Sequence, residues 1–285
     1  AAGGTFYYQI PDGINYTQDG TFTGASTGYV VYDAKNSIIT LNGSNDSTTD
    51  TYLLPGWSDD YVSPTNTKGN TILRDTTALG NGISLGTLGL GGGAIYETAA
   101  DTFTRTLGTA NNTVHTRAKT NLSIGSVTPS TTEASKGSGF SSINPNGTTI
   151  TTPFTFAAPT TTSTTVWGGS LMMGTAKRTS TGYLTFTGAM NLNGVNQEFF
   201  VFPGYSTNWL GVTADGLDSS AEISSVIAGT TTAGILTKKG PGKLILSNKN
   251  TYIGSTHFAD GYMDVAYLGL QYGSGSSTIG GTIYV

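Results

Sequence analysis

Hydrophobic residues along this chain occur in short runs that alternate with polar residues, and turn-forming residues separate one run from the next. Typical runs are residues 4–8 (GTFYY), 37–41 (SIITL), 181–187 (TGYLTFT) and 242–246 (GKLIL). Each run has roughly the four to eight residues of a β-strand, and none shows the 3.6-residue period of an amphipathic helix. The pattern predicts an all-β protein with many short strands. Periodicity alone leaves a sandwich, a barrel and a β-solenoid open.

Composition supports this prediction and excludes two other classes. The chain has 285 residues, of which 41 are glycine, and it is rich in Thr, Ser and Asn, which are poor helix formers. Charged residues make up 11 %, against about 25 % in a typical globular protein. Aromatic residues make up 10 % and the net charge is only −4, whereas disordered chains lack aromatics and carry high net charge. We therefore expect an ordered protein without helices.

Two stretches, residues 42–70 and 128–165, are rich in Asn, Asp, Ser, Thr and Pro and alternate little. Apolar residues such as Phe140, Ile150 and Phe154 lie within the second stretch. They favour loops on a continuous body over a linker between domains. We expect one elongated domain over residues 1–285, with loop-rich insertions near 42–70 and 128–165.

Charge and cysteine content limit the partners and the location. The 13 basic and 17 acidic residues leave no basic patch for nucleic acid. No apolar stretch approaches the ~18 residues of a transmembrane helix, so we expect no membrane insertion by this chain. The chain has no cysteine. With its low charge, this suits an extracellular protein that is stabilised by β-ladders rather than by disulfides.

The most regular segment is residues 234–265, which reads as strand, Gly-Pro-Gly turn, strand, Asn turn, strand, Gly turn, strand. It resembles the autotransporter-associated β-strand repeat, also called the passenger-associated transport repeat. The positions that match are Leu236, Thr237, Lys238, Gly240, Gly242, Leu244, Leu246, Ser247, Asn250, Thr251, Tyr252, Gly254, Thr256 and Gly261. Met263 stands where the family usually has Leu, a volume-conserving change.

The resemblance implies a right-handed parallel β-helix on the outside of a Gram-negative bacterium, as a cell-surface or secreted passenger protein. With about 20 to 25 residues for each layer of a solenoid, we expect roughly 11 to 14 layers. Alternation within the repeat predicts an inward column of apolar and small side chains. Its expected members are Leu236, Leu244, Leu246, Tyr252, Thr256 and Met263.

Candidate catalytic groups are few. The carboxylates that could serve a polysaccharide-acting enzyme are Asp59 with Asp60, and Asp215 with Asp218 and Glu222. Asp59 and Asp60 are adjacent and would point to opposite faces of a strand. The segment from Asp215 to Asp218 has the composition of a turn. We therefore expect no catalytic residues and no enzyme.

Candidate metal and cofactor sites are equally weak. The two histidines, His115 and His257, form no metal-binding motif. An oxygen-rich loop lacks the spacing of a calcium-binding loop, and the glycine-rich residues 89–93 lack a strand-to-helix context for phosphate binding. We expect no metal and no cofactor. The loop's candidate ligands are Asn42, Asn45, Asp46 and Asp50.

The two ends of the chain have matching sequences, and both lack the polar cap with which solenoids usually close. We interpret them as equivalent strands of the repeat, or as the two cut ends of a longer repeat array. If they are equivalent strands, the last strand of one copy can continue into the first of the next and build a filament. The expected self-association residues are Gly4, Thr5, Phe6, Tyr7 and Tyr8, with Gly281, Thr282, Ile283, Tyr284 and Val285.

Three functions stay open at this point. The first is a non-enzymatic extracellular structural protein whose partner is itself, a self-assembling surface fibre. The second is an adhesin or glycan-binding passenger domain that contacts surface glycans or a host or neighbouring cell through loop aromatics. The third is a polysaccharide-acting β-helix enzyme. The aromatics expected for the second function are Tyr52, Trp57, Tyr61, Trp167, Tyr205 and Trp209.

Overall fold

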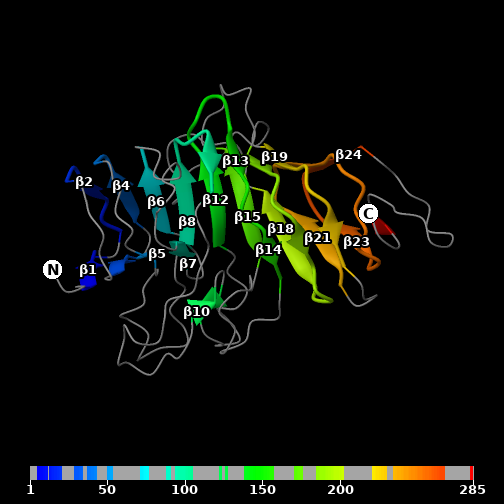
Figure 1. Cartoon of the computed structure of the whole chain (residues 1–285), viewed down its shortest axis with the longest axis horizontal. Helices are drawn as coiled ribbons and strands as arrows, with labels where there is room; N and C mark the ends of the chain where they lie inside the picture. Colours follow the sequence, from blue (N-terminus) through cyan, green and yellow to red (C-terminus); the bar gives the residue numbers. More distant parts are fainter. Residues whose placement is uncertain are drawn as a thin grey trace.

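The described part of the chain consists of β-strands, turns and connecting segments, with no helix. The computed structural model describes residues 5–11, 13–20, 29–34, 37–43, 50–53, 71–76, 88–90, 94–104, 122–123, 126–127, 138–156, 170–175, 184–201, 220–229, 234–266 and 283–284. The strands follow one another from the N-terminal to the C-terminal end of an elongated body (Figure 1). The prediction of an all-β protein without helices is confirmed for these residues.

A ten-stranded sheet runs the length of the body, and all its neighbouring strands are parallel. Its strands occur in chain order. They are β2 (Tyr16–Gln18), β4 (Ile38–Leu41), β6 (Thr71–Asp75), β8 (Ala94–Thr98), β12 (Ser138–Ser142), β15 (Leu171–Thr175), β18 (Gln197–Val201), β21 (Leu236–Lys239), β23 (Thr256–Phe258) and β25 (Ile283–Tyr284).

Three further parallel sheets accompany it. The four-stranded sheet holds β1 (Thr5–Gln9), β3 (Tyr29–Asp33), β5 (Asp50–Leu53) and β7 (Leu88–Leu90). The six-stranded sheet holds β9 (Thr102–Phe103), β13 (Thr148–Ile150), β16 (Leu184–Phe186), β19 (Ser220–Ile223), β22 (Lys243–Leu246) and β24 (Tyr262–Val265). The three-stranded sheet holds β14 (Phe154–Thr155), β17 (Met190–Asn191) and β20 (Ile227–Ala228). The antiparallel pair is β10 (Leu122–Ser123) with β11 (Ser126–Val127).

Each strand of the ten-stranded sheet begins what we call a layer, which extends to the next strand of that sheet. Ten strands of this sheet lie within the described residues and begin ten layers. The expected 11 to 14 layers stay a prediction. The described layers are unequal in length. Leu236 and Thr256, aligned on β21 and β23, are 20 positions apart, whereas Tyr96 and Phe140, aligned on β8 and β12, are 44 positions apart.

One apolar core runs through the layers, from Ile10 near the N-terminus to Tyr252 near the C-terminus. Its middle is a chain of aromatic contacts. Phe140 lies with ring centroids 5.3 Å from Phe103 and 6.2 Å from Phe154, and Phe156 lies 5.7 Å from Phe199. The contacts of Phe140 with Phe103 and of Phe156 with Phe199 join side chains from different layers, so the layers bury their apolar side chains against one another.

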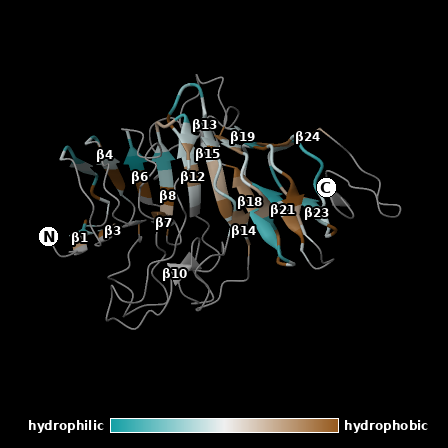
Figure 2. Cartoon of the chain, viewed as in Figure 1, coloured by the Kyte–Doolittle hydropathy of each residue, from teal (hydrophilic) through white to brown (hydrophobic). Residues whose placement is uncertain are grey.

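The C-terminal strands alternate between buried and half-buried residues, as a sheet with one buried face does. Strand β22 has this pattern, and in Figure 2 strands β18 and β21 carry both hydrophobic and hydrophilic stretches. The expected inward residues of the repeat are buried apart from Met263, which is half-buried and packs against the same core. The buried ones are Leu236, Leu244, Leu246, Tyr252 and Thr256.

The other repeat residues form the turns. The Asn250 side-chain oxygen accepts the backbone N–H of Ile227 in the preceding layer at 2.8 Å. Gly240 and Gly261 have positive φ, +77° and +79°, which strains any other residue. A Cβ on Gly254 would lie 1.4 Å from the Gly234 carbonyl oxygen, so this position excludes a side chain. Gly242 is buried in the same turn as Gly240.

Both loop-rich stretches contain strands. Strand β5 lies within residues 42–70 and pairs with β3 and β7. Strands β12, β13 and β14 lie within residues 128–165. Strands β12 and β13 pair with strands of the layers on either side, and β14 pairs with β17 of the following layer. Phe140, Ile150 and Phe154 belong to the common core. The parts of these stretches that the structure describes therefore join the continuous stack of sheets.

Candidate functional site

The N-terminal end of the core is open to solvent over several apolar side chains. Strands β1 and β2 are edge strands of their sheets. Phe6 is aligned with the buried Val30 on β3, so both side chains face the core, yet Phe6 is 52 % exposed. Ile14, just before β2, is also 52 % exposed. The inward column of the core thus ends at a solvent-accessible aromatic side chain.

Tyrosines continue this end surface. Tyr8 stacks on Tyr32 with ring centroids 5.3 Å apart and lies 6.1 Å from Tyr16. The buried Tyr32 hydroxyl donates to the Gln18 side-chain oxygen at 2.9 Å. Burial raises the pKa of Tyr32, and burial together with the Tyr16 phenol raises the pKa of Tyr8. The phenols of Tyr8 and Tyr32 are therefore neutral at physiological pH. We call the group of Phe6, Tyr8, Ile14 and Tyr16 the N-terminal end surface.

The C-terminal end of the stack is formed by β24 and β25, the last strands of the six-stranded and ten-stranded sheets. Met263 and Val265 on β24 are half-buried and pack against the core. Tyr262 is 55 % exposed. Lys243 on β22 forms a salt bridge with Asp264 on β24. Apart from this pair, the described residues of this edge carry no charge.

The expected self-association residues occupy both ends, but not in equivalent strands. Strand β1 belongs to the four-stranded sheet, whereas β25 belongs to the ten-stranded sheet. The interpretation of the two ends as the same strand of the repeat is therefore wrong, because matching sequences do not specify the sheet. Gly4, Gly281, Thr282 and Val285 lie outside the described residues, as do the side chains of Thr5, Tyr7, Ile283 and Tyr284.

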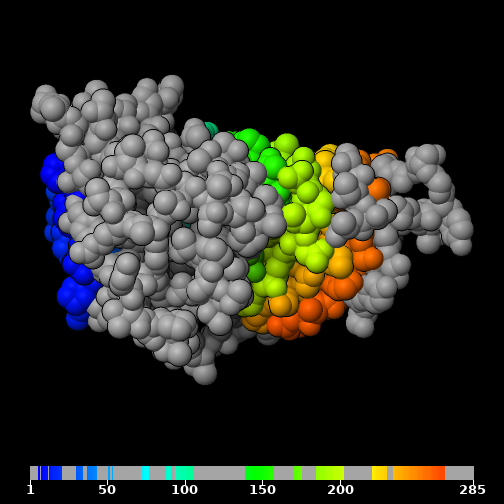
Figure 3. Space-filling model, turned by 90° about the horizontal axis from the view of Figure 1, so that it is seen from below, coloured from blue at the N-terminus to red at the C-terminus, as the bar shows by residue number. Residues whose placement is uncertain are grey.

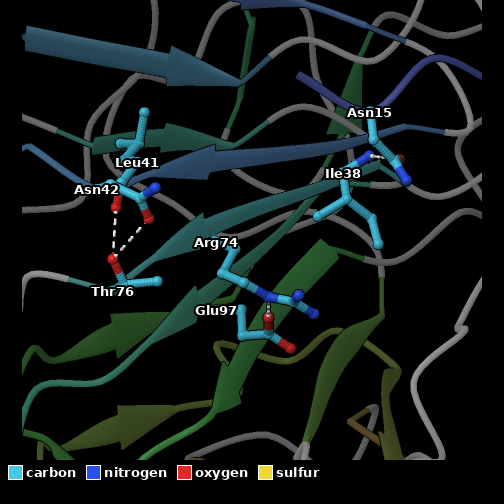
Figure 4. A network of polar contacts seen from close by, with 7 residues as sticks. All are labelled: Asn15, Ile38, Leu41, Asn42, Arg74, Thr76 and Glu97. Carbon is cyan, nitrogen blue, oxygen red and sulfur yellow. Dashed lines mark hydrogen bonds and ion pairs between the residues drawn. The ribbon is translucent and has the colours of Figure 1, made fainter. Parts of the chain in front are cut away.

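A buried polar cluster that sequence analysis missed lies on the outer face of the ten-stranded sheet. Arg74 on β6 donates from Nε to Glu97 on β8 (Figure 4). Ser141 on β12 is aligned with Glu97. Burial raises the pKa of Glu97, while the Arg74 charge and hydrogen bond oppose the rise. Glu97 Oε1 and Ser141 Oγ are buried without a hydrogen-bond partner. Glu97 and Ser141 are fully buried, whereas the Arg74 side chain is partly exposed.

Lys238 is a second buried charge, at an inward position of the repeat. Its side chain is fully buried, and Nζ donates to the carbonyl oxygens of Lys239, Gly240 and Asp260 at 3.0, 2.6 and 2.8 Å. Burial lowers the pKa of Lys238 to about 8, while Asp260 opposes this. Alternation with Leu236 signals this inward position in the sequence. The ammonium group joins two successive layers across their turns.

Of the carboxylates considered for catalysis, Glu222 is the one that lies within the described residues. Glu222 lies on β19 and accepts a hydrogen bond from the Ser247 hydroxyl at 2.6 Å. This places it in an ordinary contact between neighbouring strands. Asp59, Asp60, Asp215 and Asp218 lie outside the described residues.

No group of three or more His, Cys, Asp or Glu residues that could hold a metal ion occurs among the described residues. Asn42 of the oxygen-rich loop donates to Asp19 Oδ1 at 2.9 Å and accepts from Thr76 Oγ1 at 3.1 Å (Figure 4). Asn45 and Asp46 lie outside the described residues, as does the side chain of Asp50. His257 lies half-buried on β23, and His115 is outside the described residues.

The loop aromatics expected to bind glycans are not placed by the structure. Tyr52 lies on β5, but its side chain is not described. The other five, Trp57, Tyr61, Trp167, Tyr205 and Trp209, lie outside the described residues. Within the described part of the chain, no helix is long and apolar enough to cross a membrane.

The described geometry defines the chain as an all-β protein built from long parallel sheets. No protein-family model, curated protein or solved structure matches it. The resemblance of residues 234–265 to the autotransporter-associated repeat stays a prediction.

Proposed function

We propose that this chain is a non-enzymatic structural protein on the exterior of a Gram-negative bacterium, and that copies of it join end to end into a fibre. In this proposal the parallel sheets form a right-handed parallel β-helix. The connection between parallel strands of one sheet is right-handed in about 98 % of cases, which supports this handedness. The extracellular location rests on the repeat resemblance of residues 234–265 and on the low charge of the chain.

The observation that carries the proposal is the end of the core at Phe6. Along the inward row that Phe6 begins, Val30 is 4 % exposed, Thr51 is half-buried and Leu88 is fully buried, whereas Phe6 itself is 52 % exposed. A further layer placed on β1 would bury this ring. Burying an aromatic side chain stabilises a contact by roughly 1.5–3 kcal/mol.

Open sheet edges supply the second part of the interaction. Strand β2 has one hydrogen-bonded neighbour among the described strands, so it forms an edge of its sheet to which a further strand can be added. Adding a strand to such an edge combines main-chain hydrogen bonds with side-chain burial. Because all strands within these sheets are parallel, the N-terminal edge of one copy is complementary to the C-terminal edge of another. This contact is heterologous and does not close, so it builds a linear polymer.

The experiment measures the mass of the purified protein by light scattering over a range of concentrations, with negative-stain images of the largest species. We expect linear oligomers that lengthen with concentration. Phe6→Glu places a charge in the contact and should leave a folded monomer, because Phe6 is exposed in the single copy. Val226→Glu is the matched control: Val226 is 37 % exposed and lies next to β20, in a different sheet from β1 and β2. It should assemble normally.

A wild-type protein that stays monomeric at high concentration contradicts the proposed function. If Phe6→Glu polymerises as well as Val226→Glu, the N-terminal end surface is not the contact.

A further inference from the structure

We infer that the contact between copies is the continuation of the ten-stranded sheet, with β25 of one copy pairing with β2 of the next. This inference rests on the proposed end-to-end assembly and specifies which strands meet. It replaces the expectation that β25 meets β1, the strand with the matching sequence.

The topology supports this pairing. Strands β2 and β25 are the two edges of a single sheet that runs from one end of the body to the other. Figure 1 places them toward opposite ends, and Figure 3 shows the N-terminal residues and residues 234–266 toward opposite ends in a second view. A copy that adds β25 to β2 keeps the sheet parallel and keeps its inner face toward the core.

The inner face of β2 supplies the side chain that such a layer would cover. Tyr16 begins an inward row whose next members are Ile39 on β4, Leu73 on β6 and Tyr96 on β8. These three side chains are fully buried, whereas Tyr16 is half-buried because the row ends there. The nearby Ile14 is exposed as well. A layer on β2 would bury both, together with Tyr8, which lies against Tyr16.

A contact between β25 and β1 fits less well. It would place the ten-stranded sheet of one copy against the four-stranded sheet of the next, so the second copy would have to rotate about the long axis. Tyr16 and the edge of β2 would then face a different sheet. The occupant that fits the N-terminal edge is therefore a second copy in the same orientation about that axis.

Because the chain contains no cysteine, single cysteines report on the contact directly. Thr17 on β2 and Gln9 on β1 are both exposed, so neither substitution disturbs the core. Tyr284 on β25 is aligned with His257, which is half-buried on the outward side of β23. Neighbouring strands in a sheet lie about 4.8 Å apart, within reach of a short bifunctional thiol reagent.

The experiment mixes Tyr284→Cys with Thr17→Cys in one sample and with Gln9→Cys in the other, then adds the reagent and separates the products by mass. We expect a cross-linked dimer as the main product of the Thr17→Cys mixture and at most a trace from the Gln9→Cys mixture. Each variant alone is the control for contacts between like edges.

The outcomes separate this inference from the proposed function. If the Gln9→Cys mixture reacts in preference, or if neither reacts although the mixtures form fibres in negative stain, the β2–β25 pairing is overturned and end-to-end assembly stands. If neither mixture reacts and light scattering shows monomers, both are overturned. A further segment of the same polypeptide or a different protein is then the occupant of the N-terminal edge.

Discussion

The N-terminal and C-terminal layers use the same parallel sheet but cover its outer face differently. In β8, all five residues from Ala94 to Thr98 are buried, whereas β18 of the same sheet alternates between buried and half-buried residues. A sheet buried on both faces loses the alternation of a sheet with one face in water. In their described residues, the N-terminal layers that begin with β4, β6 and β8 are therefore two-sided, and the C-terminal layers that begin with β18, β21 and β23 are one-sided.

The side chains on the outer face follow this difference. In the N-terminal layers, Ile38, Ile72 and Ile95 form a second apolar cluster on the face opposite the main core. In the C-terminal layers the corresponding face carries Glu198, which accepts from Lys239 at 2.7 Å and from the Ser170 hydroxyl at 2.9 Å. On this outer face the one-sided layers thus keep their charged groups partly in solvent, whereas the two-sided layers must pair theirs inside.

The largest expected effect comes from placing a charge in the core of the one-sided layers. Leu246→Asp places a carboxylate in the dry core, where Leu246 has no exposure. An uncompensated buried charge costs about 3–5 kcal/mol, so the C-terminal layers should unfold at much lower denaturant concentration. Thr237→Asp is the control, because Thr237 is half-buried on the outward side of β21. If chemical denaturation gives the same midpoint for both variants, the inward and outward assignments are wrong.

The second prediction addresses the buried ion pair of the two-sided layers. Arg74→Met leaves the Glu97 carboxylate buried and unpaired, which should cost about 3 kcal/mol at pH 7. The loss should shrink near pH 4, because Glu97 can then bind a proton in the folded state, where its pKa is raised. Thermal unfolding at the two pH values measures this. The double variant Arg74→Met, Glu97→Leu should recover most of the stability at pH 7, and failure to recover contradicts the assignment.

The sequence predicted the one-sided layers better than the two-sided ones. Leu244, Tyr252 and Gly254 could be assigned because alternation and turn glycines report on a single layer. Glu97 could not, because its partner Arg74 is 23 positions away and its strand has no alternation. The two chain ends were wrongly equated for a related reason. A match such as that of Thr5 with Thr282 shows only that the local sequences are alike. The sheet to which a strand belongs depends on the length and path of every preceding layer.

The third prediction tests how closely the backbones of neighbouring one-sided layers approach one another. Gly254→Ala brings a Cβ to within 1.4 Å of the Gly234 carbonyl oxygen, so the backbone of two layers must separate. Such overpacking costs about 1–3 kcal/mol. Gly20→Ala is the matched control near the N-terminal end, since a Cβ there meets nothing within 4 Å. Its denaturation midpoint should stay at the wild-type value, and equal losses for the two variants would contradict the close approach at Gly254.

The smallest expected effect concerns Lys238 and follows from its pKa. In the folded chain the pKa is about 8, against 10.5 for an unperturbed lysine, so between these values the unfolded chain binds more protons than the folded one. Stability therefore rises as the pH rises from about 8, by on the order of 1–3 kcal/mol in total. Above about pH 10 the rise should end. Above that pH the Tyr32 phenol loses its proton in the unfolded chain but keeps it in the folded chain, where burial raises its pKa, so stability then falls as the pH rises.

Thermal unfolding between pH 7.5 and 10, in about half-unit steps, measures this effect on the C-terminal layers. Lys238→Met removes the titrating group and should abolish the rise, although it lowers stability overall because three carbonyl oxygens lose their donor. Lys239→Met, at an exposed neighbouring position, should keep the rise. A rise that persists in Lys238→Met would assign the titration to another group. If the rise disappears in Lys238→Met alone, the titrating group is Lys238. The one-sided layers then contain a buried charge, as the two-sided layers do, but backbone carbonyls hold this charge instead of a side-chain partner.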